Sequence, residues 1–97
     1  MDSKITKFLK TFDISDNEIN DIINLSPMLK ETSYQEFMDN CNLLIKYGYP
    51  KSDLDVLILS NPNIFVRSKQ DLEKDLITLL EQYKSIEQIL KLNPYII

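Results

Sequence analysis

Three proline-containing segments of this chain share the same arrangement of apolar residues. Counting back eight, five and four residues from Pro27, Pro62 and Pro94 reaches isoleucine or leucine at all nine positions. The spacing i, i+3, i+4 places the three side chains of each segment on one helix face. Proline then stops the helix, because its ring disfavours α geometry in the preceding residue and it has no N–H to donate. The nine positions are Ile19, Ile22, Ile23, Leu54, Leu57, Ile58, Ile86, Ile89 and Leu90.

Another apolar residue follows each proline at the same distance. Two residues after the prolines come Leu29, Ile64 and Ile96. We expect the residues after each proline to form a single 3₁₀-like turn. The apolar side chain then folds back onto the core beside the helix that has just ended.

Five serines mark expected helix starts. Ser15, Ser33 and Ser85 each have Glu or Gln three residues later, which is the capping-box pattern. Ser52 and Ser68 are followed at the same distance by aspartate and are shorter acidic variants of this pattern. The serines lie 16 to 19 residues apart, so a helix is predicted to begin at nearly regular intervals.

Further apolar stripes at helical spacing lie in residues 3–11, 33–47 and 69–83, and Gly48 is expected to end the second of these helices. Helices and short Pro-terminated helices thus alternate three times, with 35 and 32 residues between successive prolines. Such a period is typical of an α-solenoid. We therefore expect one all-α domain over residues 1–97, a short solenoid of about six helices whose hand the sequence leaves open.

Composition excludes several classes of site. The single Cys41 rules out an internal disulfide and a cysteine metal cage. The absence of histidine rules out a histidine-dependent triad. No segment approaches the roughly 18 apolar residues of a membrane span, and no signal peptide is recognisable, so a cytoplasmic location is expected. Abundant Ile, Asn and Lys, with no Ala and one Arg, suggest an AT-rich genome such as that of a low-GC bacterium.

The segment LLIKYGYPKSDLDVLILSNPNIFVRSKQDLEKDLITLLEQY at 43–83 resembles a repeat of the mitochondrial transcription termination factor (mTERF) family. Residues 14–38 and 85–97 match more loosely. The resemblance implies a helical solenoid that binds nucleic acid along a basic groove. The features that carry it are the helix end Ile45–Gly48, the short-helix start Ser52–Leu54, the proline turn Pro62–Phe65 and the serine-led helix Ser68–Leu72.

Basic residues near the second proline are the candidates for contacting nucleic acid. Phosphate binding needs clustered Lys and Arg, because affinity comes largely from counterion release. Asp71, Glu73 and Asp75 interrupt the run, so a solvated helix face with interleaved charges is the competing interpretation. The candidate residues are Lys46, Lys51, Arg67, Lys69 and Lys74.

Other chemistry-bearing residues have ordinary structural interpretations. Tyr47, Tyr49 and Tyr95 are candidates for stacking on bases, but each lies beside a helix end, where a packed ring is expected. Cys41 falls on an apolar face and is expected to be a small buried hydrophobic residue. The carboxylate pairs Asp53/Asp55 and Asp71/Asp75 have neither EF-hand spacing nor a glycine-rich loop beside them.

These observations favour a non-enzymatic helical-repeat module that binds another protein, without cofactor, metal or membrane. A short solenoid with a net charge of −4 suits a peptide or protein partner. The final residues, NPYII, are expected either to be partly exposed, which favours a partner or a homodimer, or to fold back and leave the chain a monomer. The alternative is a nucleic-acid-binding regulator of the mTERF type, which the acidic charge disfavours.

Overall fold

The computed structural model describes all 97 residues and contains six α-helices and no strand, which confirms the all-α class. Three 3₁₀ turns separate some of the helices. The odd-numbered helices are α1 (Ser3–Lys10), α3 (Tyr34–Lys46) and α5 (Lys69–Gln82). The even-numbered helices are α2 (Asp16–Leu25), α4 (Leu54–Ser60) and α6 (Ile86–Leu92). The 3₁₀ turns are η1 (Pro27–Lys30), η2 (Lys51–Asp53) and η3 (Pro62–Val66).

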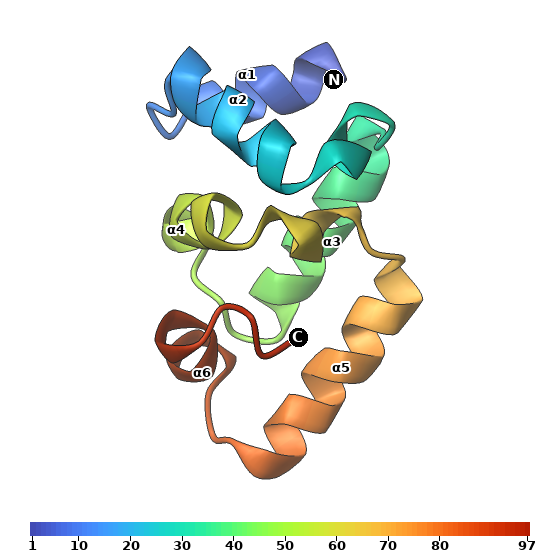
Figure 1. Ribbon diagram of the computed structural model, residues 1–97. Helices are drawn as coiled ribbons and strands as arrows, with labels where there is room; N and C mark the ends of the chain where they lie inside the picture. The colour runs from blue at the N-terminus through green and yellow to red at the C-terminus, as the bar shows by residue number, and fades with distance from the viewer.

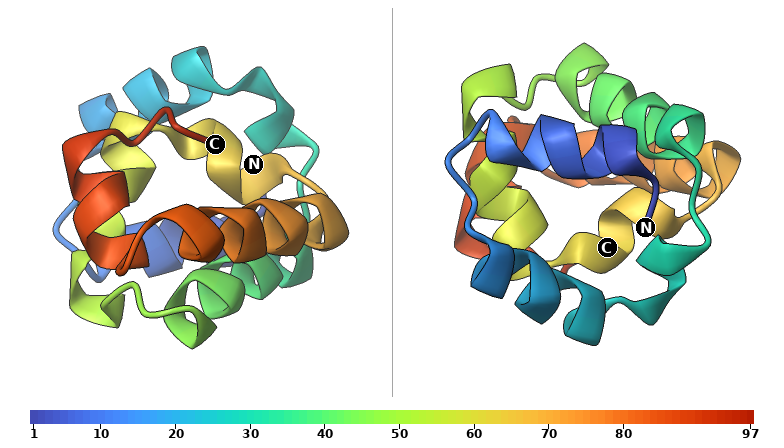
Figure 2. Two further views of the ribbon diagram at one scale, coloured as in Figure 1. Left: turned by 90° about the horizontal axis from the view of Figure 1, so that it is seen from below. Right: turned by 90° about the horizontal axis from the view of Figure 1, so that it is seen from above.

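The helices form two layers along the long axis of the molecule. Helix α3 contacts α1 on one side and α5 on the other, and α2 contacts α4 in the second layer (Figure 1). End-on views show α1 and α5 at opposite ends of the molecule, running in similar directions (Figure 2). The molecule measures 37 × 23 × 20 Å, so its length reflects this stacking.

The proline stops have closely similar backbone hydrogen bonds. The residue two after proline donates its N–H to the carbonyl of the residue before proline, over 3.0, 3.3 and 3.2 Å at Pro27, Pro62 and Pro94. The first two prolines begin η1 and η3, as predicted. The third is followed by a turn but not by a 3₁₀ helix.

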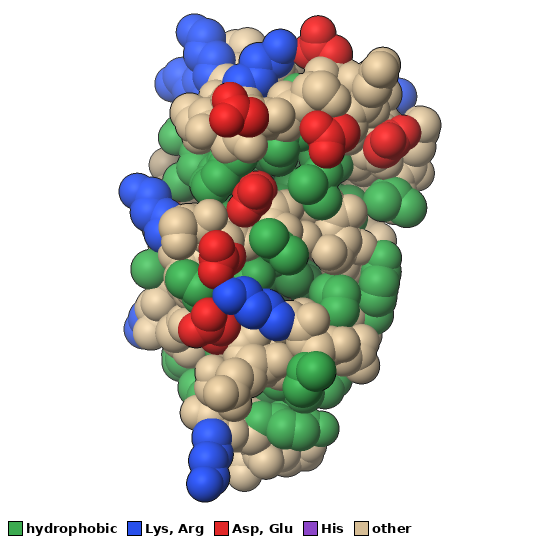
Figure 3. Space-filling view, turned by 90° about the vertical axis from the view of Figure 1, so that its left-hand side faces the viewer, with side chains coloured by type: hydrophobic (Ala, Val, Ile, Leu, Met, Phe, Trp, Pro, Cys, Tyr) green, Lys and Arg blue, Asp and Glu red, His purple; other side chains and the backbone are tan.

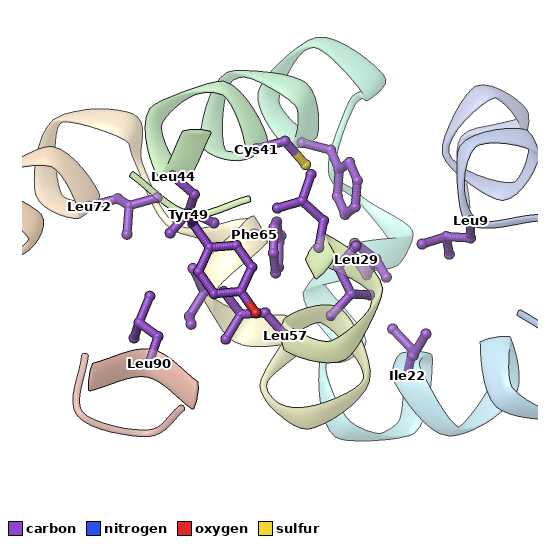
Figure 4. Packing of buried hydrophobic residues seen from close by; sticks show 14 of the residues in the cluster. Leu9, Ile22, Leu29, Cys41, Leu44, Tyr49, Leu57, Phe65, Leu72 and Leu90 are labelled. Atoms are coloured by element: carbon purple, nitrogen blue, oxygen red, sulfur yellow. The ribbon is translucent and has the colours of Figure 1, made fainter. Parts of the chain in front are cut away.

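One cluster of 20 buried residues fills the space between the two layers. Seven of the nine predicted positions are buried in it, while Ile23 and Ile89 are partly buried against it. The ring of Phe37 stacks on Phe65 at 5.3 Å and meets Phe8 edge-on at 5.8 Å, which joins α1, α3 and η3. Figure 4 shows side chains from both layers meeting in this core.

Four of the five serines cap helices as predicted. Ser15 and Ser33 form complete capping boxes with Glu18 and Glu36. The Ser68 and Ser85 side chains accept the N–H groups of Asp71 and Gln88. The capping box predicted at Ser85 is only half formed, because the Gln88 side chain makes no return bond.

The prediction that Ser52 caps α4 is wrong. Ser52 lies inside η2, and α4 begins without a side-chain cap. The N–H of Asp53 donates to the Pro50 carbonyl at 3.0 Å, and the N–H of Leu54 donates to the Lys51 carbonyl. Backbone bonds of a 3₁₀ turn thus stand where the serine cap was expected.

Gly48 ends α3 as predicted, in the left-handed region with φ of 106°. Its N–H donates to Ile45 and that of Tyr49 donates to Leu44, the two bonds of a Schellman motif. Tyr49 and Leu44 are both buried, so the helix end is fixed by packing as well as by hydrogen bonds. None of the six helices has the length and apolar character needed to cross a membrane.

Polar side chains also connect segments that are distant in sequence. Asn40, buried on α3, donates to the carbonyls of Ile64 and Arg67 at 3.3 and 2.8 Å. Asn61 donates to the carbonyl of Pro94 at 2.9 Å. These bonds hold the proline turns against their neighbours and position the surfaces described below.

Candidate functional site

The five basic candidates lie around α3, α5 and the turns next to them. Lys46 ends α3, and Lys51 lies in η2. Arg67 lies in the short connection between η3 and α5, and Lys69 and Lys74 are on α5 itself. Since α3 contacts α5, Lys46 reaches across to the same helix that carries the last two.

Lys46 is neutralised by a carboxylate on α5. Its Nζ lies 3.3 Å from Glu73 Oε2, and the Tyr47 hydroxyl donates to the same oxygen at 2.7 Å. These two hydrogen bonds, that from Tyr47 first, hold the pKa of Glu73 below its ordinary value. The hydrogen bond to Glu73 raises the pKa values of both Lys46 and Tyr47. This trio joins α3 to α5 and leaves little free positive charge.

Arg67 is also paired. Its Nη2 donates to the carboxylate of Asp75 and more weakly to the carbonyl of Asp71, at 3.4 Å. The adjacent groove is lined by Arg67 and Lys69 together with the acidic side chains of Glu36 and Asp39. Positive and negative groups therefore alternate along this groove.

The remaining three candidates, Lys51, Lys69 and Lys74, are exposed and form no ion pair. Lys69 nonetheless lies near enough to Glu73 to contribute to its lowered pKa. A groove beside Lys74 also includes Glu73. The structure thus places four of the five basic residues, all except Lys51, near carboxylates. The role of the five in nucleic-acid binding stays a prediction.

The three candidate tyrosines have different environments. Tyr49 is buried, and its hydroxyl donates to the Asp53 carbonyl at 3.1 Å. Tyr47 is partly buried and engaged with Glu73. Tyr95 is 65% exposed, which agrees with the expected exposure of the final residues, whereas the expectation that its ring is packed is wrong. Its hydroxyl donates to the carbonyl of Ser60, which leaves the ring on the surface.

Cys41 and the carboxylate pairs hold no reactive arrangement. Cys41 is fully buried, as predicted, and burial raises its pKa to about 12. Asp53 pairs with Lys91 at 2.7 Å, and this bond, with a second one to Glu87, raises the lysine pKa. No three Asp, Glu or Cys side chains come close enough to hold a metal ion.

The even-numbered helices carry exposed apolar side chains. Leu25 on α2, Val56 on α4 and Leu92 on α6 are 53%, 49% and 83% exposed. Met28 in η1 and Tyr95 after α6 are exposed as well. Figure 3 shows several groups of hydrophobic side chains on this side of the molecule, with acidic and basic side chains between them. We call Leu25, Val56 and Leu92 the even-helix face.

A second feature, which sequence reasoning missed, is a groove of about 470 Å³ at the N-terminal end of the layer formed by α1, α3 and α5. The i, i+3, i+7 spacing of Lys4, Lys7 and Thr11 was a readable signal for three of its residues. Tyr34 is remote in sequence and was not foreseeable. The groove is lined by Lys4, Lys7, Phe8, Thr11 and Tyr34.

Comparison with known proteins identifies no relative: no family, curated protein or solved structure matches this chain.

Proposed function

We propose that this protein is a short α-solenoid that binds a protein partner through the even-helix face. Three successions of helix, helix and proline turn support the solenoid interpretation, since the prolines lie at near-regular intervals and their turns share one hydrogen-bond pattern. No catalytic role is proposed, because no convergent set of acid, base and nucleophile is present.

The observation that carries the proposal is the exposure of large apolar residues on three successive even-numbered helices. A single exposed leucine is ordinary, whereas a set on neighbouring elements indicates a contact surface. Leu92 is the most exposed of them at 83%. Covering these side chains by a partner removes apolar area from water and so favours binding.

Charge narrows the class of partner. Helix α2 bears Asp16, Glu18 and Asp21 and no basic residue. The net charge of the chain is −4. Electrostatic complementarity therefore favours a partner surface with apolar anchors and a rim of lysine or arginine.

Selection from a random peptide library displayed on phage tests the proposal. We expect the immobilised protein to enrich peptides that combine apolar residues with Lys or Arg. The double substitution Val56→Ser/Leu92→Ser should abolish binding of the enriched peptides without lowering the unfolding temperature. The matched control is Ile77→Ser/Leu80→Ser, which changes two apolar side chains on α5 that are 46% and 39% exposed. Equal binding by both variants, or no enrichment at all, would contradict the proposal.

Nucleic-acid binding of the mTERF type is the second candidate. The resemblance of residues 43–83 and the three exposed, unpaired lysines Lys51, Lys69 and Lys74 support it. Fluorescence anisotropy with single- and double-stranded DNA and RNA, at low and physiological salt, tests it. Binding that survives physiological salt and weakens in Lys69→Ala/Lys74→Ala would favour this candidate, and no binding at low salt would remove it.

A further inference from the structure

A groove on α1 has the chemistry of a second binding site, separate from the even-helix face. Lys4, Lys7 and Phe8 occupy one side of α1, because residues three and four apart share a helix face, and Thr11 at the C-cap continues this side. Tyr34, the first residue of α3, closes the groove from the neighbouring helix.

Asp2 holds the two walls of this groove together. One carboxylate oxygen accepts the N–H of Lys4 and the other accepts the N–H of Tyr34, each at 2.9 Å. Both bonds lower the pKa of Asp2, that from Lys4 being the stronger cause. The carboxylate is therefore engaged with the backbone of α1 and α3, and Tyr34 is fixed beside α1.

Neither lysine of the groove forms an ion pair, and Lys4 lies near enough to Asp2 to contribute to its lowered pKa. The five ion pairs engage Lys10, Lys46, Arg67 and Lys91 and leave Lys4 and Lys7 free. The Lys4 ammonium instead lies 5.9 Å from the centre of the Tyr34 ring. A cation over an aromatic face remains available to a carboxylate that approaches from solvent.

Phe8 forms the apolar base of the groove, and other aromatic rings pack against it. It is partly buried, and its ring meets Phe12 and Phe37 edge-on at 5.4 and 5.8 Å. With Tyr34, it provides aromatic surface in the same groove as the two lysines. The groove thus combines unpaired positive charge with apolar rings.

We propose that this groove binds an acidic segment of a partner protein. Two carboxylates of the segment pair with Lys4 and Lys7, and an apolar side chain between them rests on Phe8 and Tyr34. The groove's volume of about 470 Å³ accommodates such a set of side chains. This site does not depend on the even-helix face, which we expect to bind apolar and basic surface instead.

Charge favours an acidic protein segment over nucleic acid. Tight phosphate binding uses several neutralised phosphates, and the groove offers two unpaired ammonium groups. A long polyanion would extend beyond the groove over a protein with a net charge of −4, where repulsion acts within about 8 Å at physiological salt. A short segment with two carboxylates stays within the positive region.

The test is selection from a random peptide phage library on the wild-type protein, with removal of peptides that also bind Lys4→Glu/Lys7→Glu. We expect the remaining peptides to carry two or more Asp or Glu around an aromatic or aliphatic residue. In fluorescence anisotropy, a synthetic peptide from this pool should bind Lys4→Glu/Lys7→Glu with an affinity at least about tenfold lower than its affinity for wild type. The control Lys69→Glu/Lys74→Glu makes the same charge change on α5 and should bind the peptide nearly as well as wild type.

Three outcomes would overturn the proposal. The selection returns no peptide that separates the two proteins, the separating peptides are neutral or basic, or the acidic peptide binds both double variants equally.

A polythymidine oligonucleotide is titrated in parallel. If it alone binds, and if its binding is lost in Lys4→Glu/Lys7→Glu, the groove is a nucleic-acid site and the proposal is wrong. Circular dichroism checks that Lys4→Glu/Lys7→Glu folds, and Tyr34→Leu, which keeps both lysines, serves as a second variant expected to weaken peptide binding. Loss of binding in Val56→Ser/Leu92→Ser instead would assign the peptide to the even-helix face.

Discussion

The residues just before Pro27 and Pro62 both have buried polar side chains, but only one of these side chains has a hydrogen-bond partner. Asn61 is buried and donates to the Pro94 carbonyl, whereas the hydroxyl of Ser26, also buried, has no partner. We expect Asn61→Ala to lower the free energy of unfolding by about 0.5–1.5 kcal/mol, because it removes a partly buried hydrogen bond between distant segments. Ser26→Ala removes an unsatisfied group and should be neutral or stabilising. Urea unfolding measures both, and a larger loss for Ser26→Ala would contradict this assignment.

The backbone at Gly48 gives a prediction that depends on conformation alone. A Cβ atom built there meets nothing within 4 Å, so no clash opposes a larger residue. Its φ of 106° nevertheless disfavours any L-residue. Gly48→Ala should therefore lower the free energy of unfolding by about 1–2 kcal/mol. Gly48→Asn, which tolerates positive φ better, should cost less, and equal losses in urea unfolding would argue against a conformational cause.

At the scale of secondary-structure elements, substitutions in α4 test which helix face is buried, as predicted by counting back from Pro62. Leu57 is 1% exposed and Val56, its neighbour, is 49% exposed. Leu57→Ala should lower the free energy of unfolding by about 2–5 kcal/mol, because it opens a cavity in the core. Val56→Ala should change it by no more than about 0.5 kcal/mol. Similar losses for the two substitutions, measured by urea unfolding, would show that the helix face is misassigned.

The contact between α3 and α5 gives a prediction about pH. Hydrogen bonds from Tyr47 and Lys46 hold the pKa of Glu73 below its ordinary value of 4.5. Such a carboxylate stabilises the fold fully above the unfolded-state pKa, and this contribution disappears as pH falls through the folded-state pKa. The stability difference between wild type and Glu73→Gln should therefore be larger at pH about 7 than at pH about 3.

Glu81→Gln is the matched control for this measurement, because Glu81 is exposed on the same helix and forms no ion pair. Chemical denaturation of the three proteins at both pH values gives the comparison. A wild-type advantage over Glu73→Gln that is unchanged at low pH would show that the trio adds no pH-dependent stability.

The elements predictable from sequence are those set by neighbours along the chain. Helix faces, proline stops and the Gly48 helix end depend on residues within about one or two helical turns, so periodicity and cap residues identify them. The prediction for Ser52 was wrong because two local structures compete there, and a 3₁₀ turn over Lys51–Asp53 forms in place of the serine cap. Local sequence gives no measure of which solution is more stable.

Features made by distant residues were not predictable in the same way. Asn40 lies among the apolar positions of α3, and its partners, 24 and 27 residues away, become visible only in the fold. The α1 groove likewise needs Tyr34, which Asp2 binds across 32 residues. For the basic candidates, the sequence showed the acidic neighbours Glu73 and Asp75, but it did not show which basic residue each of them pairs with.

At the scale of the whole molecule, the continuous core bears on how the protein unfolds. Its 20 buried residues form one cluster that runs from Ile5 in α1 to Leu90 in α6. In the α-solenoid that we propose, stability is a sum of terms between neighbouring units, and a long array of this kind can unfold in parts. In this short chain, α3 contacts α1, α5 and η3, so losing any unit exposes a large share of the core. We therefore expect a single two-state transition.

Leu9→Ala and Leu90→Ala test this expectation from opposite ends of the core, where both side chains are buried. Each should shift the unfolding midpoint seen by far-ultraviolet circular dichroism and by tyrosine fluorescence to the same extent, because cooperative unfolding reports one equilibrium to every probe. The five tyrosines make the second probe usable without tryptophan. A split transition in Leu90→Ala, with a fluorescence change before the loss of helix signal, would instead show that α5 and α6 unfold separately. The contacts between neighbouring helices would then be weaker than the continuous core implies.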